Sequence, residues 1–386
     1  MRYSRRDLLA FAAQAPLFGA ASGALRWLPG GDDRCLVVLE LEGGNDGLNT
    51  LIPVDDPVYA RVRPTLASVR KGALPVAAGF ALHPALAPLH ALMQQGKAAA
   101  IHGVGYPQPD RSHFKSRDIW HTGDPAFERE TATTTGWLGR AADALAARGA
   151  AVPGISVGSL QVPLALRSRH VVVPSLQRIE DYQLLGDPAA GRIASEGEGG
   201  AAFVAEVARA AIAASERLRT ALAAYRSKAE YPDDDLGRKL QLLAKLVVSG
   251  FGTRLFHLGF GGFDTHARQA PAQDALLRMV GNGLAALLRD LDGHQALGRV
   301  RILVHSEFGR RLAENQSLGT DHGAAAPVFL LGEHFAAPLQ GTPPSLRDLD
   351  DGDLKFTCDF RNVHAELLAW IGLKPAAAPD RPASGR

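Results

Sequence analysis

The sequence predicts an α/β fold, with a mostly parallel central sheet and helices on both faces. Short apolar runs alternate with segments of helical spacing along the chain, and several of these runs are continuous and end in glycine or polar residues. Strands that are buried on both faces have this continuous apolar character, and their alternation with helices indicates helices on both sides of the sheet. A chain of 386 residues, 46% hydrophobic and 21% charged, is long enough to bury such a core.

The predicted strands are the apolar runs. The first, CLVVLELEGG (35–44), ends in glycines, as a buried strand entering a functional loop does. Strands are expected at 35–41, 98–103, 254–259, 300–306 and 326–331, as mostly parallel neighbours in one sheet, with shorter strands at 154–158 and 170–174.

Between the strands, apolar residues at helical spacing predict helices at 83–96, 139–150 and 272–291. One or two long amphipathic helices are expected over 201–249, interrupted at Tyr231 and Pro232. Residues 186–200 form a Gly-rich, flexible insertion. We expect one domain over 31–386.

The N-terminal segment predicts export. Residues 1–30 join a basic region to a moderately apolar stretch that ends in small residues, as in a signal peptide. Arg5-Arg6 favours the twin-arginine route to the periplasm or the exterior, while an amphipathic first helix is the alternative. Gln14 and Pro16 interrupt the apolar part, which is shorter than the roughly 20 residues of a membrane span, so no span is expected in the mature protein.

Charge and cysteine content exclude other classes. The 42 basic and 40 acidic residues form no long block of one sign, which gives no reason to expect a nucleic-acid partner. Cys35 and Cys358 are too few for a disulfide framework. The absence of a Gly-x-Gly-x-x-Gly fingerprint or a cysteine motif disfavours a redox enzyme.

Polar residues cluster where the predicted strands end. They are Asn45-Asp46, Asp264 with His266, Glu307, and Asp321-His322 just before the last strand. Ligands in such sheets lie beyond the carboxyl ends of the strands, and carboxylates with imidazoles suit Zn, Mn, Mg or Ca. Each residue also has an ordinary explanation: a turn for Asp46, a helix N-cap for Asp264, helix entry for His266, and an ion pair with Arg310 or Arg311 for Glu307.

Six segments in this order carry a family resemblance: the Ser-Arg-Arg signal, GGNDGLNTLIP, RSHFKSRDIWHTG, GFDTH, SEFGRR and GTDHGAAAPVFLLG. Together they resemble the exported bacterial family known as domain of unknown function 1501, which belongs to the alkaline phosphatase superfamily with sulfatases and phosphodiesterases. The resemblance covers essentially the whole mature chain and implies an alkaline phosphatase-like α/β fold.

The resemblance also implies metal ligands. Asp46 matches a ligand near the nucleophile, and Asp264 with His266 resembles the Asp–His pair of a second metal, with a shorter spacing. Glu307 stands where the superfamily has Asp, and Phe308 where it has His, so one ligand is lost. His322 is expected to complete the Asp264–His266 metal, although Asp321-His322 can instead be the superfamily's Asp-His-Gly pair.

The nucleophile in the superfamily is a Ser, Thr or modified Cys at the start of a helix after the second strand. Ser112 is the nearest hydroxyl here, with Arg111 and His113 available for an anionic group. Pro occupies the position of a sulfatase nucleophile, which argues against a standard sulfatase, and an N-cap role is the alternative for Ser112.

These expectations combine into a metal-dependent hydrolase of phosphate or sulfate esters that acts on an anionic small molecule or glycan ester. The alternative is a degenerate, non-catalytic member that binds a glycan, lipid or protein partner in the cell envelope. Asp264, His266 and His322 are expected to lie around one point, with Glu307 and Asp46 facing the same cavity.

Overall fold

The computed structural model describes residues 33–77, 79–131, 133–177, 222–250 and 252–374. The predicted export signal and the insertion at 186–200 lie outside these residues, as does the part of the expected helices between 201 and 221.

A nine-stranded sheet forms the centre of the described fold, in the order β11-β5-β10-β9-β1-β8-β6-β7, with β14 also pairing with β5. The strands are β1 (Cys35–Leu41), β5 (Ala98–Gly105), β6 (Gly154–Val157), β7 (Ser175–Leu176), β8 (Leu255–Phe260), β9 (Val300–His305), β10 (Ala326–Leu331), β11 (Leu339–Gln340) and β14 (Cys358–Asp359). The five principal strands expected from the sequence therefore lie in one sheet.

One of these five strands does not follow the prediction of parallel neighbours. β10 pairs antiparallel with both β9 and β5, whereas β1 is parallel to β8 and to β9. The sheet stays mostly parallel. The reversal has a consequence for function, because the start of β10 lies at the same edge as the ends of β1, β8 and β9.

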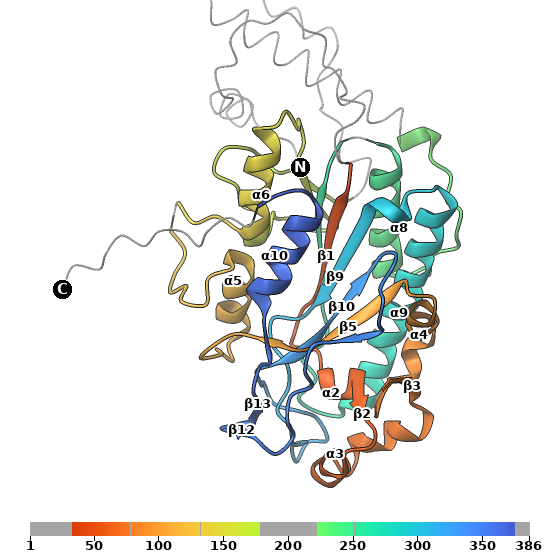
Figure 1. The fold of residues 1–386 in the computed structure, drawn as a ribbon, viewed down its shortest axis with the longest axis vertical. Coiled ribbons are helices and arrows are strands. Elements are labelled where there is room, and N and C mark those ends of the chain that lie inside the picture. The colour runs from red at the N-terminus through yellow and green to blue at the C-terminus, as the bar shows by residue number, and fades with distance from the viewer. Residues whose placement is uncertain (1–32, 78, 132, 178–221, 251, 375–386) are drawn as a thin grey trace, which may run out of the picture.

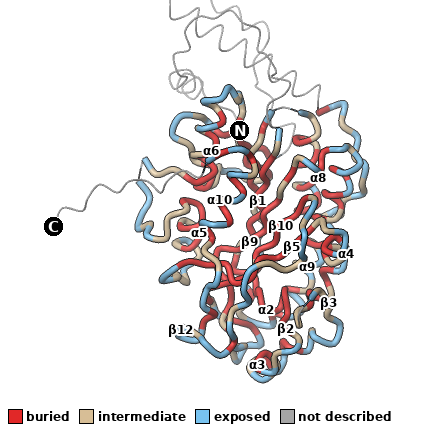
Figure 2. The backbone as a smooth tube through the Cα atoms, viewed as in Figure 1, coloured by how far each residue is buried: buried red, intermediate tan, exposed pale blue. Residues whose placement is uncertain are grey.

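Helices cover both faces of the sheet (Figure 1). On one face lie α5 (His113–Thr122), α6 (Trp137–Ala146) and α10 (Phe360–Trp370), and on the other lie α4 (Ala87–Gln94), α8 (Asp235–Val248) and α9 (Gln269–Gly293). Alternate residues of β1 pack into two separate cores: Leu36 and Val38 on the α5 side, and Val37 and Leu39 on the α9 side. Figure 2 shows the strands as the most continuously buried part of the chain.

The helices follow from local signals in the sequence. In α8 the Asp234 side chain accepts the N–H of Gly237, and Leu236, Leu240 and Leu243 form the buried stripe. α5 ends at Gly123, whose φ of +70° is readily adopted only without a side chain. α9 exceeds the range expected for it, 272–291, by a few residues at each end.

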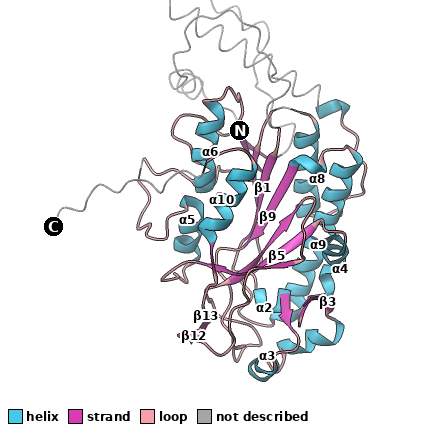
Figure 3. Cartoon of the chain, in the orientation of Figure 1, coloured by secondary structure: helices cyan, strands magenta, loops and turns pink. Residues whose placement is uncertain are grey.

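A smaller region covers the carboxyl end of the sheet (Figure 3). It contains the elements α2 (Gly47–Thr50), β2 (Leu51–Pro53), α3 (Pro57–Val62), β3 (Leu74–Ala77), β4 (Phe80–Leu82), β12 (Leu349–Asp350) and β13 (Asp353–Leu354). Its own core includes Ile52 and Tyr59.

The strand expected at 170–174 is not formed. The Asp143 carboxylate accepts the N–H groups of Arg169 and His170, and the Ser168 hydroxyl accepts that of Val171. These donors are thus used by side chains, and only the two-residue strand β7 follows. Among the described residues, none of the helices has the length and apolar character needed to cross a membrane.

Candidate metal centre

Four loops meet at one edge of the sheet. The loop after β1 contributes Gly43 and Gly44, and the loop after β8 contributes Asp264 and His266. Glu307 lies just beyond β9, and His322 precedes the antiparallel β10. The first residue of α5, His113, arrives from the end of β5.

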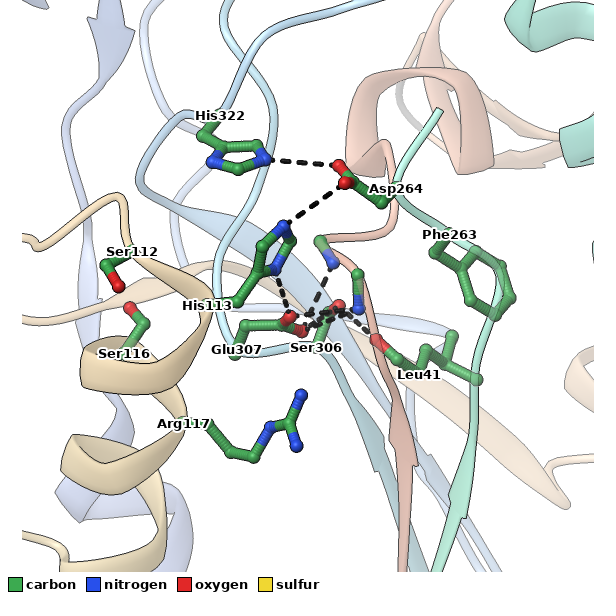
Figure 4. Close-up of polar contacts among 12 residues, drawn as sticks. Leu41, Ser112, His113, Ser116, Arg117, Phe263, Asp264, Ser306, Glu307 and His322 are labelled. Carbon is green, nitrogen blue, oxygen red and sulfur yellow. Dashed lines mark hydrogen bonds and ion pairs between the residues drawn. The ribbon is translucent and has the colours of Figure 1, made fainter. Parts of the chain in front are cut away.

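Imidazole nitrogens and one carboxylate converge here (Figure 4). His322 Nε2 lies 3.1 Å from Asp264 Oδ1, and His113 Nε2 lies 3.4 Å from Asp264 Oδ2. His266 Nε2 lies 3.0 Å from Asp264 Oδ1 and 2.8 Å from His322 Nε2. The ligand atoms of His113, Asp264 and His322 all lie within 4.8 Å of one another, and His266 flanks them with its side chain 42% exposed.

Hydrogen bonds fix the orientation of each ring. His322 Nδ1 lies 2.8 Å from the Arg111 carbonyl oxygen, which can only accept, so Nδ1 carries the hydrogen. His113 Nδ1 faces Glu307 Oε1 at 2.8 Å, and His266 Nδ1 faces Asp321 Oδ1 at 3.4 Å. Nε2 of each ring therefore faces the Asp264 carboxylate, and in His322, whose Nδ1 carries the hydrogen, the neutral ring has its lone pair on Nε2, as in metal-binding histidines.

Glu307 supports His113 from beneath. Its side chain is fully buried, and its oxygens accept the N–H groups of Gly43 at 2.9 Å and Gly44 at 3.1 Å. Glu307 does not form the ion pair with Arg310 or Arg311 that was its alternative explanation. Glu307 instead joins the β1 loop to His113, whose Nε2 is buried without a hydrogen-bond partner among the described residues.

Arg310 is the cation of this site. It donates to Asp264 Oδ1 at 2.8 Å and, from the same buried side chain, to the carbonyl oxygens of Gly43, Gly44 and Thr320. Burial alone would raise the pKa of Asp264, but the hydrogen bond and the positive charge of Arg310 outweigh burial and lower that pKa to about 2. Asp264 is therefore ionised at neutral pH, as a metal ligand must be.

The donor set fits a divalent ion. Ligands about 2.0–2.2 Å from a tetrahedral ion lie about 3.3–3.6 Å from one another, close to the distances of 3.1 Å from His322 and 3.4 Å from His113 to the Asp264 oxygens. A buried, unpartnered His113 Nε2 aimed at the Asp264 carboxylate is the atom that an ion would bind. The metal-ligand roles of Asp264, His266 and His322 stay predictions.

Asp46 does not join this cluster of donors. Its side chain is 1% exposed, pairs with Arg63 Nη1 at 2.6 Å, and accepts from Gln269 and from the N–H of Asn49 as the N-cap of α2. These contacts fit the alternative explanation of Asp46 as a turn-stabilising residue. Arg63 supplies the positive charge that a metal was expected to supply.

Asp321 lies behind the cluster. Its carboxylate accepts from Asn315 at 3.0 Å and faces His266 Nδ1. In this arrangement the carboxylate orients His266, and the ligand pair of Asp321 with His322 stays a prediction. The N-cap explanation for Asp264 is wrong, because α9 begins later, at Gln269, with Arg268 as its N-cap.

The residues expected to carry the nucleophile are arranged differently from the prediction. Ser112 is the N-cap residue of α5 without a side-chain capping bond, and it takes no part in the contacts drawn in Figure 4. The Arg111 guanidinium donates to Asp353 at 2.7 Å and to Asp351 at 3.1 Å. It is thus already paired with carboxylates, and Arg111 reaches the cluster through its backbone carbonyl oxygen.

Sequence reasoning missed the ligand geometry of His113 and the role of Arg310. The spacing signal was present for His113, because His113, Arg117 and His121 recur every four residues and so share one face of α5. Nothing in the sequence indicates that Arg310 pairs with Asp264 rather than Glu307.

A cavity of about 500 Å³ adjoins the cluster, with Phe308 and Arg111 in its wall. The Phe308 ring also contacts two imidazoles of the cluster, with centroid distances of 4.9 Å to His113 and 4.6 Å to His322.

The fold and this edge define the class: an α/β protein with a candidate divalent-metal centre beyond the strand ends. The chain belongs to the family described as "Protein of unknown function (DUF1501)", whose model matches residues 33–334. The family resemblance found in the sequence motifs is thereby confirmed. No curated protein matches the chain.

Several solved structures are similar to the chain at low identity. One is the C-terminal periplasmic domain of EcEptC from Escherichia coli in complex with Zn (10% identity, 90% of this chain and 84% of that one, TM-score 0.42). Another is an alkaline phosphatase superfamily protein from Vibrio parahaemolyticus (12%, 99% and 80%, TM-score 0.41). A third is the lipoteichoic acid synthase LtaP from Listeria monocytogenes (7%, 97% and 79%, TM-score 0.42).

Proposed function

We propose that the protein is an exported, metal-dependent hydrolase of phosphate or sulfate esters. The observation that carries the proposal is the convergence of His113, Asp264 and His322 at an edge that solvent can reach. Sites with a catalytic metal offer three protein ligands and leave a further position open for water or substrate. The ester class comes from the motifs that resemble the alkaline phosphatase superfamily.

A divalent ion held by His113, Asp264 and His322 would supply a Lewis acid for an ester oxygen and would favour the ionised form of an attacking water. Glu307 holds His113 with Nε2 facing Asp264, where it would bind the ion, and Arg310 keeps Asp264 ionised and oriented. His266 Nε2, on the exposed side, is placed to carry a proton to the leaving oxygen. The cavity behind Phe308 can take the uncharged part of an ester.

A second candidate function is binding without turnover. Two observations favour it: Asp46 is neutralised by Arg63, and the expected nucleophile Ser112 lies outside the contacts of the cluster. A protein of this kind would hold an ion and a glycan, lipid or protein partner in the envelope without hydrolysis.

The test uses purified mature protein loaded with Zn²⁺ or Mn²⁺ and assayed with p-nitrophenyl phosphate, bis-p-nitrophenyl phosphate and p-nitrophenyl sulfate. Hydrolysis is expected on at least one ester, and His322→Ala should lower kcat/KM by about 100-fold or more. His266→Ala should lower kcat while metal content stays near the wild-type value.

Two outcomes decide against hydrolysis. Metal-loaded protein with no turnover on any of the three esters favours the binding function. Activity that survives both substitutions in the cluster places the chemistry elsewhere in the molecule.

A further inference from the structure

A second group of metal-ligand side chains is buried between α5 and the sheet. It consists of Glu40 near the carboxyl end of β1, His257 on β8 and His121 in the last turn of α5. Their exposed fractions are 1%, 3% and 4%. None of the three takes part in the solvent-facing cluster around Asp264.

The sheet register explains why they meet. Val38 pairs with His257 across β1 and β8, so Glu40, two residues further along, points to the same face as His257. This is the face covered by α5, where His121 lies about two helical turns after His113. A glutamate inside an apolar strand thus faces two imidazoles from two other elements.

One oxygen of Glu40 is shared by both rings. His121 Nε2 lies 2.9 Å from Glu40 Oε2, and His257 Nε2 lies 3.4 Å from the same oxygen. Arg117 Nε lies 3.5 Å from the other oxygen, Oε1, and balances the carboxylate charge from that side. The geometry leaves Oε2 as the atom that faces the two Nε2 atoms.

Hydrogen bonding in this layer is incomplete. Glu40 Oε1, His257 Nε2 and Arg117 Nε are buried without a hydrogen-bond partner among the described residues, and so is the hydroxyl of Ser156, which pairs with His257 across β6 and β8. Buried polar groups are nearly always satisfied, and an unpaired one costs free energy. Arg117 Nε and Glu40 Oε1 face each other at 3.5 Å as an ion pair, so the atom that points to a bound cation is His257 Nε2, which lies 3.4 Å from Glu40 Oε2.

We propose that Glu40, His121 and His257 form a second, buried site for a late first-row divalent ion such as Zn²⁺. Two imidazoles and one carboxylate are borderline ligands that suit this class of ion. The ion joins α5 to β1 and β8 beneath the solvent-facing centre. Because His113 is the first residue of the same helix, the buried ion also positions His113.

The first experiment leaves the buried residues intact. The variant Asp264→Asn/His322→Ala removes two donors of the exposed centre. After loading with Zn²⁺ and desalting, it should retain about one equivalent of zinc and lose it to EDTA more slowly than wild-type protein loses its exposed ion. Retention of less than about 0.2 equivalents by this folded variant overturns the proposal.

The second experiment adds Glu40→Gln to that variant, and the zinc content should fall from about one equivalent to less than about 0.2. Ser156→Ala on the same background is the matched control, since it changes the same buried layer without touching a ligand, and it should keep the ion. Unchanged zinc in the Glu40→Gln variant also overturns the proposal, because Glu40 and His121 then form only an ion pair.

A third measurement does not depend on the folding of any Glu40 variant. Co²⁺ in the Asp264→Asn/His322→Ala protein should give visible absorption bands of a low-coordinate nitrogen and oxygen site. The absence of such bands contradicts the site. Because the exposed centre is already removed in this variant, failure of the buried site and failure of the proposed hydrolase are distinguished.

Discussion

Which nitrogen of each imidazole carries the hydrogen decides what the exposed centre can bind. Acceptors at Nδ1 hold three rings with Nε2 facing Asp264: the Arg111 carbonyl oxygen for His322, Glu307 for His113, and Asp321 for His266. Such acceptors raise ligand basicity and orient the ring. The orientation of the three rings therefore depends on the acceptors at Nδ1, and the metal-ligand roles of Glu307 and Asp321 stay predictions.

The loss of His322 tests the centre directly. His322→Ala should abolish most binding of a divalent ion at the exposed edge, because Nε2 faces Asp264 Oδ1 at 3.1 Å. The free energy of unfolding without metal should change by less than about 1 kcal/mol, since a loop histidine contributes little to a core. Metal content and urea unfolding measure the two effects.

His334→Ala is the matched control, because its side chain is 91% exposed and lies away from the cluster. Full metal occupancy at the exposed edge in His322→Ala would show that the segment TDHG is only a turn.

Glu307 provides a test of orientation. In Glu307→Gln the amide NH₂ must face either His113 Nδ1–H or the N–H groups of Gly43 and Gly44, so one donor loses its acceptor. Metal affinity should fall about 10- to 100-fold. Isothermal titration with Zn²⁺ measures the affinity.

Glu314→Gln is the control for this substitution, because Glu314 also accepts backbone N–H groups, those of Thr65 and Leu66, away from the cluster. Equal zinc affinities of Glu307→Gln and Glu314→Gln would contradict the role of Glu307.

The sequence could predict which single residues gather but not what each of them binds. Asp264, His266 and His322 flank the ends of predicted strands, which is the signal that predicts them, and the structure brings them together. The contacts of Asp46 were not predictable, because its partner Arg63 comes from a separate helical segment with no strand-end signal. Tertiary packing decides which residue pairs with a buried charge, and a local sequence pattern carries no information about that packing.

At the scale of elements, the loop after β1 must pass close to the loop after β8. Gly43 has a φ of +112°, and a Cβ there would lie 2.5 Å from the backbone nitrogen of Asp264. A side chain at this position therefore strains its own backbone and displaces Asp264. The positions of the candidate metal ligands thus depend on a glycine outside the donor set.

Gly43→Ala should lower the free energy of unfolding by about 2–4 kcal/mol and weaken metal binding. Gly149→Ala is the matched control, since Gly149 also has a positive φ, +95°, but nothing lies within 4 Å of its added Cβ. It should show only the backbone cost, roughly 1 kcal/mol, with metal binding unchanged. Chemical unfolding and zinc titration separate the two, and equal effects of both substitutions would be inconsistent with a close approach at Gly43.

Strand existence was predictable, but strand direction was not. Continuous apolar runs mark β1, β5, β8, β9 and β10, yet the same run fits a parallel or an antiparallel neighbour. The connection from β9 to β10 contains no regular helix or strand that would return the chain to the other edge. For that reason β10 runs back antiparallel and Asp321-His322 lies at the ligand edge.

At the scale of the whole molecule, the export proposal concerns a segment outside the described residues. Replacing Arg5-Arg6 by Lys-Lys should leave the precursor in the cytoplasm, because the twin-arginine pair is what that route reads. Cell fractionation and immunoblotting of precursor and mature forms measure the effect. A double-Lys variant that still reaches the periplasm at the normal rate would exclude the twin-arginine route.

The stability of the whole fold should also depend on pH through its buried histidines. His364 on α10 stacks on Trp137 with a centroid distance of 3.9 Å. Burial, with smaller contributions from His305 and Arg140, holds the pKa of His364 well below its ordinary value. The folded state thus keeps this ring neutral, while the unfolded chain binds a proton below about pH 6.5.

The sign follows from linkage. A histidine whose pKa is lowered by folding leaves stability intact above the pKa of the unfolded state and reduces it as pH falls below that value. Between pH 7.5 and 5.5 the His364 contribution should be a loss of about 1.4 kcal/mol. Burial also lowers the pKa of His102 and of His83, which add to the loss.

His364→Gln should therefore be less stable than wild type at pH 7.5, where the stacking on Trp137 is lost, yet lose about 1.4 kcal/mol less on acidification to pH 5.5. Urea unfolding at both pH values, with EDTA present so that metal release does not contribute, measures the difference. His334→Gln at the surface is the control. If His364→Gln loses as much stability as wild type over this range, His364 is already protonated in the fold or is not the group that titrates on unfolding.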